Sequence, residues 1–179
     1  FMMGQGKRIE VEITDRSVKV RDYGRGIPLG KLVDCVSIIN TGAKYDSNVF
    51  QKSVGLNGVG TKAVNALSNY FKVTAFRDGK EKTAEFERGE LTLEHKETKT
   101  TEENGTLVTF VPDDKIFKNF HFVQEYLDNQ FWNYCYLNAG LVMNLNGKRY
   151  VSKNGLLDLL QRKTNEDEIR YPIIHLTGD

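Results

Sequence analysis

The sequence predicts an α+β fold, a two-layer sandwich in which a mixed, mostly antiparallel sheet of about eight strands carries its helices on one face. Three observations lead to this class. Short segments alternate apolar and polar residues, as half-buried strands do. Several of them are joined by dipeptides typical of tight turns, namely Asp78-Gly79, Asn104-Gly105 and Asn146-Gly147. Other segments repeat apolar residues at helical spacing and predict three or four helices.

The first part of the chain predicts a β-hairpin, a helix and a long loop. Alternating residues indicate strands over residues 9–13 and 18–22 with a turn between them. Pro28 precedes a helix of about three turns, whose apolar positions are Leu29, Leu32, Val33, Val36 and Ile39. Residues 41–58 show little periodicity, and loops of that length often act as functional lids.

The middle of the chain predicts a second helix and most of the sheet. The helix is marked by Ala63, Val64, Leu67 and Tyr70. Strands are expected over residues 72–77, 80–87, 90–95 and 106–111. The charged residues 96–104 predict a solvated hairpin tip, and Pro112 closes the last of these strands.

The last part predicts a long amphipathic helix, a hairpin and a short helix. The long helix is marked by Val123, Leu127, Phe131 and Tyr134. Residues 141–145 and 148–151 form the hairpin, and Asn154 is expected to cap the short helix. Residues 164–179 are interpreted as a linker followed by the first strand of a further domain.

The composition is that of one soluble globular domain. The chain has 179 residues, of which 39% are hydrophobic and 27% charged. It contains no apolar run of about 18 residues, the length that a membrane span needs. The formal net charge is +1. A domain that held nucleic acid by itself would be more basic, so any DNA binding is expected mainly elsewhere in a larger protein.

Cysteine and histidine positions do not indicate a disulfide or a zinc site. Cys35 and Cys135 lie in apolar periodic segments and are interpreted as buried small hydrophobic residues, which fits a reducing cytoplasm. The histidines are scattered, without the spacing of metal ligands, at positions His95, His121 and His175.

Two glycine-containing loops, residues 22–28 and residues 55–60, together predict a nucleotide pocket. Asp22 ends an apolar strand, where its carboxylate can accept a hydrogen bond from an exocyclic amine such as that of adenine; the alternative is a cap for the turn at Gly24. The second loop runs into a helix, and its N–H groups favour anions such as phosphate. Its Gly-x-x-Gly-x-Gly order is neither a P-loop nor a Rossmann fingerprint.

Residues beside these loops are further candidates for the nucleotide pocket, although some of them also have a purely structural interpretation. Ile27 and Pro28 could form an apolar wall against a purine, and Arg25 is expected to pair with an acidic neighbour. Lys62 is a possible counter-charge to phosphate, although an exposed position is the favoured interpretation. Thr106 could bind the same adenine edge as Asp22, or be only a β-branched residue in a strand.

Four motifs in this order resemble the ATPase domain of the B subunits of bacterial type II topoisomerases. They occupy residues 22–28, 41–46, 55–68 and 105–106. The resemblance covers nearly the whole chain and implies the Bergerat ATP-binding fold of the GHKL superfamily, to which Hsp90, MutL and sensor histidine kinases also belong. Within the topoisomerases it favours topoisomerase IV, with gyrase as the alternative.

The resemblance implies ATP and Mg²⁺ as cofactors and assigns site residues. Asp22 would bind the adenine amine, with Gly26 and Thr106 assisting through water. The remainder of the adenine pocket would be formed by Val20, Gly24, Ile27 and Pro28. Lys44 would lie in the ATP lid, and the triphosphate would be wrapped by Gly55, Leu56, Asn57, Gly58, Val59 and Gly60. The rim of the pocket for coumarin-type inhibitors would include Arg25 and Arg77.

For the whole protein the resemblance implies an ATP-operated clamp that passes DNA through a cleaved duplex. Its partners would be DNA, the topoisomerase A subunit and a second copy of the B subunit. The family's catalytic Glu and magnesium-binding Asn are expected upstream of Phe1, so no catalytic or metal-binding residue of the family falls within this chain. The chain alone is therefore expected to have negligible ATPase activity.

The resemblance also predicts the domain organisation. Residues 1–163 would be the ATP-binding domain without its N-terminal helix, and residues 164–179 a linker and the start of a transducer domain. Asn57 replaces the more usual His, and the link from Pro28 to the lid is shorter than in gyrase. Two alternatives remain, a MutL-type ATPase and a non-catalytic nucleotide-binding interaction domain.

Overall fold

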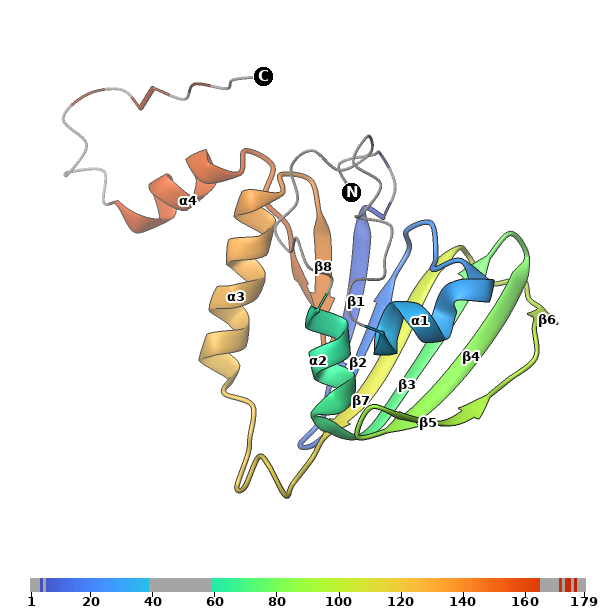
Figure 1. The fold of residues 1–179 in the computed structure, drawn as a ribbon. Helices are drawn as coiled ribbons and strands as arrows, with labels where there is room; N and C mark the ends of the chain where they lie inside the picture. The colour runs from blue at the N-terminus through green and yellow to red at the C-terminus, as the bar shows by residue number, and fades with distance from the viewer. Residues whose placement is uncertain are drawn as a thin grey trace. The chain divides into compact units, whose positions relative to one another are not determined.

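The computed structural model describes residue 4, residues 6–38, residues 59–164, and residues 171, 173–174 and 176. The chain divides into an N-terminal unit, Phe1–Phe122, and a C-terminal unit, Val123–Asp179. The predicted loop at 41–58 and most of the tail after residue 164 lie outside the described residues. The described residues contain nine strands and four α-helices, which confirms the α+β class (Figure 1).

The N-terminal unit is built on an antiparallel sheet whose strand order is β5-β4-β3-β7-β2-β1, with β6 paired to β4. The strands are β1 (Arg8–Ile13), β2 (Val18–Asp22), β3 (Ser68–Arg77), β4 (Lys80–Glu87), β5 (Glu90–Glu94), β6 (Thr98–Lys99) and β7 (Gly105–Pro112). The predicted β3–β4 turn is confirmed: Asp78 and Gly79 both have positive φ, as a tight hairpin turn requires.

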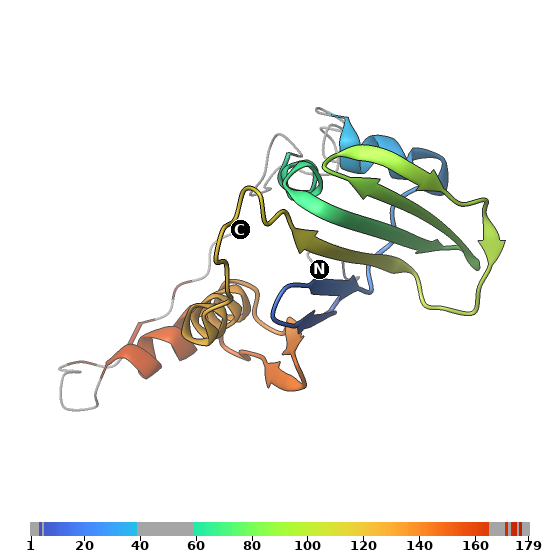
Figure 2. The ribbon, with the colours of Figure 1, turned by 90° about the horizontal axis from the view of Figure 1, so that it is seen from below.

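Two short helices cover one face of this sheet, as the views in Figures 1 and 2 agree. A 3-10 turn, η1 (Leu29–Lys31), leads into α1 (Leu32–Ser37), and α2 (Gly60–Ala66) follows later in the chain. Their apolar faces and the central strands form one core cluster: Leu32, Val36, Phe71, Val73, Ala75, Ala84 and Phe86. Residues 71, 73 and 75 alternate along β3, so the helix-bearing face is the buried one.

Both helices are shorter than the sequence predicts. The backbone of Ile38 is already extended, with φ −95° and ψ 124°, so α1 ends at Ser37. The second helix ends at Ala66, and Tyr70, expected on that helix, lies in β3. The cause is hydrogen bonding to distant parts of the chain, because Asp113 N donates to Leu67 O and Arg88 N donates to Ser68 O. These bonds favour an extended backbone over a continued helix.

The C-terminal unit contains α3 (Gln124–Leu137), the hairpin β8 (Val142–Leu145) and β9 (Lys148–Tyr150), and α4 (Leu156–Lys163). The hairpin is confirmed, with φ values of 47° at Asn146 and 84° at Gly147. Tyr150 is fully buried, and its ring lies 5.3 Å from that of Phe131 and 5.5 Å from that of Trp132, centroid to centroid. Both cysteines carry free thiols; Cys135 is buried and Cys35 is half-buried.

The start of α4 differs from the prediction. Its N-cap is Gly155, and no side chain of the described residues caps it, so the assignment of Asn154 as the cap is wrong. Instead, the Asp158 carboxylate reaches back and accepts hydrogen bonds from Ser152 Oγ at 2.6 Å, Asn154 Nδ2 at 2.8 Å and Asn154 N at 3.0 Å. These donors, Ser152 first, lower the pKa of Asp158 from 3.8 to about 2.

The Asp158 cluster predicts a stability difference that depends on pH. Because the folded-state pKa is the lower one, the charged carboxylate stabilises the fold above the unfolded pKa of 3.8, and this contribution is lost as the pH falls through about 2. Asp158→Asn should therefore lower the melting temperature at about pH 6, and the difference from wild type should shrink towards about pH 2. Thermal unfolding followed by circular dichroism measures this. Asp15→Asn is the control, because exposed Asp15 accepts no hydrogen bond from the described residues. A difference that is independent of pH would contradict the assignment.

Candidate functional site

Asp22, the last residue of β2, has one carboxylate oxygen occupied and one available. Gly24 N donates to Asp22 Oδ1 at 2.8 Å, so the residue does cap the turn, as its structural interpretation expects. Among the described residues no hydrogen bond to Asp22 Oδ2 is formed. The side chain is half-buried at the end of the strand. The capping and ligand-binding interpretations are therefore compatible, because they use different oxygens.

The strand register brings Thr106 to the same end of the sheet as Asp22. The β2–β7 ladder pairs Val20 with Val108 and ends at the pair Arg21–Leu107. The next positions along the two strands are Asp22 and Thr106, and alternation puts their side chains on the same face as Val108. Val108 packs against the core cluster, so this is the face that carries α1 and α2.

Two glycines allow the loop after Asp22 to lie directly against β3 and β7. Gly26 has φ +73°, and a Cβ there would overlap the carbonyl oxygen of Phe76. Gly105 has φ +145°, and a Cβ there would overlap the carbonyl oxygen of Asp22. Neither position accepts a larger residue without a backbone shift. The predicted role of Gly26 thus has a steric basis, and Gly105, predicted as part of a turn and of the motif at residues 105–106, is equally constrained.

An apolar wall lies beside these polar groups. Ile27 and Val108 are partly buried and pack against the core cluster, and Val20 is half-buried opposite Val108. Pro28 is exposed, and its carbonyl accepts a hydrogen bond from Lys31 N. A carboxylate oxygen and a threonine hydroxyl beside such a wall suit a flat ligand with a polar edge.

The two arginines predicted at the rim differ in their contacts. Arg77 donates from Nη1 to Gly26 O at 3.3 Å and pairs with exposed Asp78 at 3.4 Å. Arg77 is therefore attached to the glycine loop itself. Arg25 is exposed and forms no ion pair with another described residue.

The phosphate-binding half of the prediction lies mostly outside the described residues. This applies to Lys44, Gly55, Leu56, Asn57 and Gly58. Val59 is the exposed residue that precedes α2, and Gly60 is the first residue of that helix. Lys62 is only 6% exposed, so the interpretation of this lysine as solvent-exposed is wrong.

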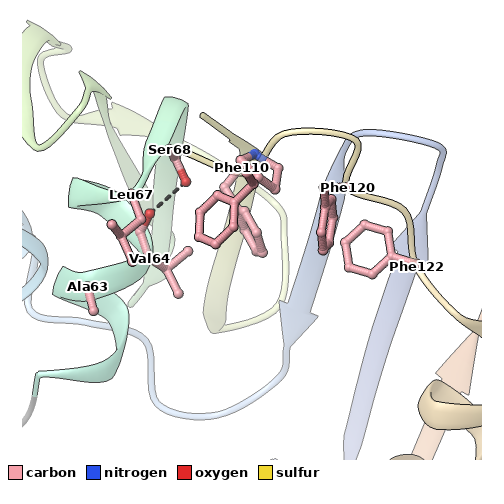
Figure 3. Close-up of a pocket in the computed structure, with 9 residues that line it drawn as sticks. Ala63, Val64, Leu67, Ser68, Phe110, Phe120 and Phe122 are labelled. Carbon is pink, nitrogen blue, oxygen red and sulfur yellow. Dashed lines mark hydrogen bonds between the residues drawn. The ribbon is translucent and has the colours of Figure 1, made fainter. Parts of the chain in front are cut away.

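A second, almost wholly apolar hollow of about 240 Å³ lies away from Asp22 (Figure 3). Side chains of α2 line one part of it and Phe120 and Phe122 another, with Phe110 between them. Ser68 Oγ, the polar group in its wall, already donates to Val64 O at 2.6 Å. Phe110 and Pro112 belong to the end of β7 opposite Gly105, so this hollow is separate from the predicted adenine pocket. Its lining offers no polar group that could recognise a purine.

In the part of the chain that the structure describes, no helix is both long and apolar enough to cross a membrane. In the same part, no group of three or more His, Cys, Asp or Glu side chains gathers as metal ligands would.

Sequence comparison relates the chain to the B subunits of type II topoisomerases, although no family model matches it. It is 48% identical over 178 residues to the DNA topoisomerase 4 B subunit of Borreliella burgdorferi, covering 99% of this chain and 30% of that protein. It is 40% identical over 141 residues to the DNA gyrase B subunit of Spiroplasma citri, covering 73% of this chain and 22% of that protein. The chain thus spans less than a third of the length of these relatives.

Structural comparison agrees with the sequence relatives. The 43K ATPase domain of Thermus thermophilus gyrase B, solved in complex with an aminocoumarin, matches with a TM-score of 0.75 and 26% identity. The match covers 95% of this chain and 47% of that one. The fold and the relatives together show that the chain is homologous to the ATPase domain of type II topoisomerase B subunits, which confirms the resemblance seen in its motifs.

Proposed function

We propose that this chain binds ATP through Asp22 and acts as the ATP-binding domain of a type II DNA topoisomerase. The observation that carries the proposal is the available Oδ2 of Asp22 beside an apolar wall. A carboxylate in that place accepts the adenine amine, while Ile27 and Val108 contact the ring face. Thr106 lies one position beyond the end of the β2–β7 ladder, and its hydroxyl contacts the same edge of the purine through water. A backbone group of Gly26 also contacts this edge through water.

The remaining site residues belong to the same proposal. Val20, Gly24 and Pro28 complete the adenine pocket, Lys44 reaches the ribose and phosphates, and the triphosphate is held by Gly55, Leu56, Asn57, Gly58, Val59 and Gly60. Mg²⁺ accompanies the triphosphate. Arg77, attached to Gly26 O, and Arg25 border the place where coumarin-type inhibitors bind.

Topoisomerase IV is the proposed parent protein, with gyrase as the alternative. Supporting this order, identity is higher and coverage longer with the topoisomerase 4 relative from Borreliella than with the gyrase relative from Spiroplasma. In the whole protein, ATP would close a homodimeric clamp in the cytoplasm on one DNA segment, which would then pass through a second duplex that the A subunit cleaves. Residues 1–163 would form the ATP-binding domain and residues 164–179 the link to a transducer domain.

The test is calorimetric titration of the chain with ADP and with IDP. IDP differs at the purine 6-position, where a carbonyl oxygen replaces the amine. In IDP this oxygen and the Asp22 carboxylate are both hydrogen-bond acceptors, so no hydrogen bond can form between them. IDP should therefore bind at least about tenfold more weakly than ADP. An aminocoumarin should displace ADP. Equal affinity for both nucleotides, or binding of neither, would refute the proposed pocket.

A further inference from the structure

We propose that Arg21 is a positioning residue for adenine recognition, acting from the face of the sheet opposite the nucleotide. It fixes the backbone at the end of β2 and thereby sets the spacing between Asp22 and Thr106. The proposal rests on the proposed function of the Asp22 site. It extends that function to a residue that touches neither the purine nor the phosphates.

The guanidinium of Arg21 lies where β2 and β7 separate. Arg21 and Leu107 are the last pair of the ladder. Immediately beyond it, Arg21 Nη1 donates to the carbonyl oxygen of Asp22 at 2.6 Å, and Nη2 donates to that of Glu103 at 2.5 Å. One planar, two-pronged side chain thus joins the end of β2 to the segment that leads into β7.

Aromatic rings hold this guanidinium in place. Its central carbon lies 4.3 Å from the ring centroid of Phe76 and 4.6 Å from that of Tyr23. Tyr23 is itself held by Glu10, which accepts a hydrogen bond from its hydroxyl at 2.8 Å, and by Arg8, 3.8 Å from the ring centroid. These contacts leave the guanidinium few alternative positions.

The energetics argue for a positioning role. Arg21 is only 8% exposed and forms no ion pair among the described residues. Burying a cation without a carboxylate partner is unfavourable, and two carbonyl acceptors and two ring faces offset the cost only if the geometry is kept. If this position contributed only to stability, an apolar side chain would avoid the cost of burying a charge. An arginine has an advantage here only because it can bind two carbonyl oxygens at once and hold them together.

The position of Gly105 couples this arrangement to the site. A Cβ on Gly105 would overlap both the Asp22 carbonyl oxygen and Arg21 Nη1, so the three groups are in direct contact. Thr106 is the next residue. A displaced guanidinium therefore moves the backbone that carries both polar groups proposed to bind adenine.

The test measures nucleotide discrimination in Arg21→Met and Arg21→Lys variants. Each protein is titrated with ADP and with purine riboside 5′-diphosphate, which lacks the exocyclic amine. Wild type should prefer ADP. Arg21→Met should weaken ADP binding about tenfold and change binding of the analogue less than about twofold, so that the preference is lost. Arg21→Lys keeps the charge without the fork, and should also lose most of the preference.

The control is Lys19→Met, on the same strand and face, which removes only an exposed pair between Lys19 Nζ and Glu12 at 3.2 Å. It should leave both affinities unchanged. If both nucleotides weaken equally in the Arg21 variants, or neither does, the positioning role is refuted. Should Arg21→Met fail to fold, Arg21→Lys decides alone. A wild type that binds ADP without preferring it refutes the adenine site, and the role of Arg21 with it.

Discussion

Replacing Asp22 by Asn is expected to weaken ADP binding by about one to two decades, without unfolding the chain. Asn keeps an oxygen for the bond from Gly24 N, so the turn should survive. Its amide nitrogen would then stand where Oδ2 stands and present a donor to the adenine amine. Losing one hydrogen bond to a charged group costs about 1.5–3 kcal/mol. Calorimetric titration with ADP measures the affinity, and thermal unfolding checks that the fold is kept.

The matched control is Asp15→Asn, which changes the same chemical group at the opposite end of the β1–β2 hairpin. It should bind ADP as the wild type does. An Asp22→Asn protein with wild-type affinity would show that the nucleotide lies elsewhere. A variant that binds ADP normally but melts far below wild type would show that Asp22 is only a turn cap.

Local signals were enough to predict most of the sheet. The dipeptides at residues 78–79 and 146–147 require positive φ values, which the structure has, and a two-residue turn sets the register of the strands it joins. The strand ending at Asp22 was located by alternation alone. These features depend on residues close in sequence, so they are visible without the fold.

The errors occurred where distant groups decide local structure. The second helix continues in the apolar pattern as far as Tyr70, but bonds to Asp113 and Arg88 draw the chain into β3. Asparagine is a residue type that often caps helices, yet Asn154 instead donates a hydrogen bond to the carboxylate of Asp158. In both places the hydrogen-bond partners compete with the intrinsic preference and prevail.

The sequence predicts only those residues of the candidate site that lie on the face of the sheet where the ligand would bind. Asp22, Gly26 and Thr106 follow from motif order, and the register brings two of them to the same end of adjacent strands. Arg21 gives no such signal, because a charged residue in an alternating strand usually faces solvent. Its partners are backbone carbonyl oxygens, one of them at Glu103, 82 residues away. No pattern of side chains reports such a contact.

Gly105→Ala is expected to abolish measurable ADP binding and to lower the melting temperature. The residue has φ +145°, which L residues rarely adopt, and the added Cβ would overlap the Asp22 carbonyl oxygen and Arg21 Nη1. Strain at such a position costs on the order of 1–3 kcal/mol. Relief requires β7 to move away from β2, which separates Thr106 from Asp22. Titration with ADP and thermal unfolding measure the two effects.

Gly79→Ala is the control that separates the effect of the steric overlap at Gly105 from the effect of an unfavourable φ. Gly79 has φ +74° in the β3–β4 turn, and no atom of the described residues lies within 4 Å of a Cβ placed there. That variant should therefore lose about 1 kcal/mol of stability from the unfavourable φ and still bind ADP as wild type does. If Gly105→Ala behaves like Gly79→Ala, the close approach of Gly105 to Asp22 does not set the geometry of the site. A loss of ADP binding confined to Gly105→Ala would show that it does, because both variants carry an unfavourable φ and only one has the overlap.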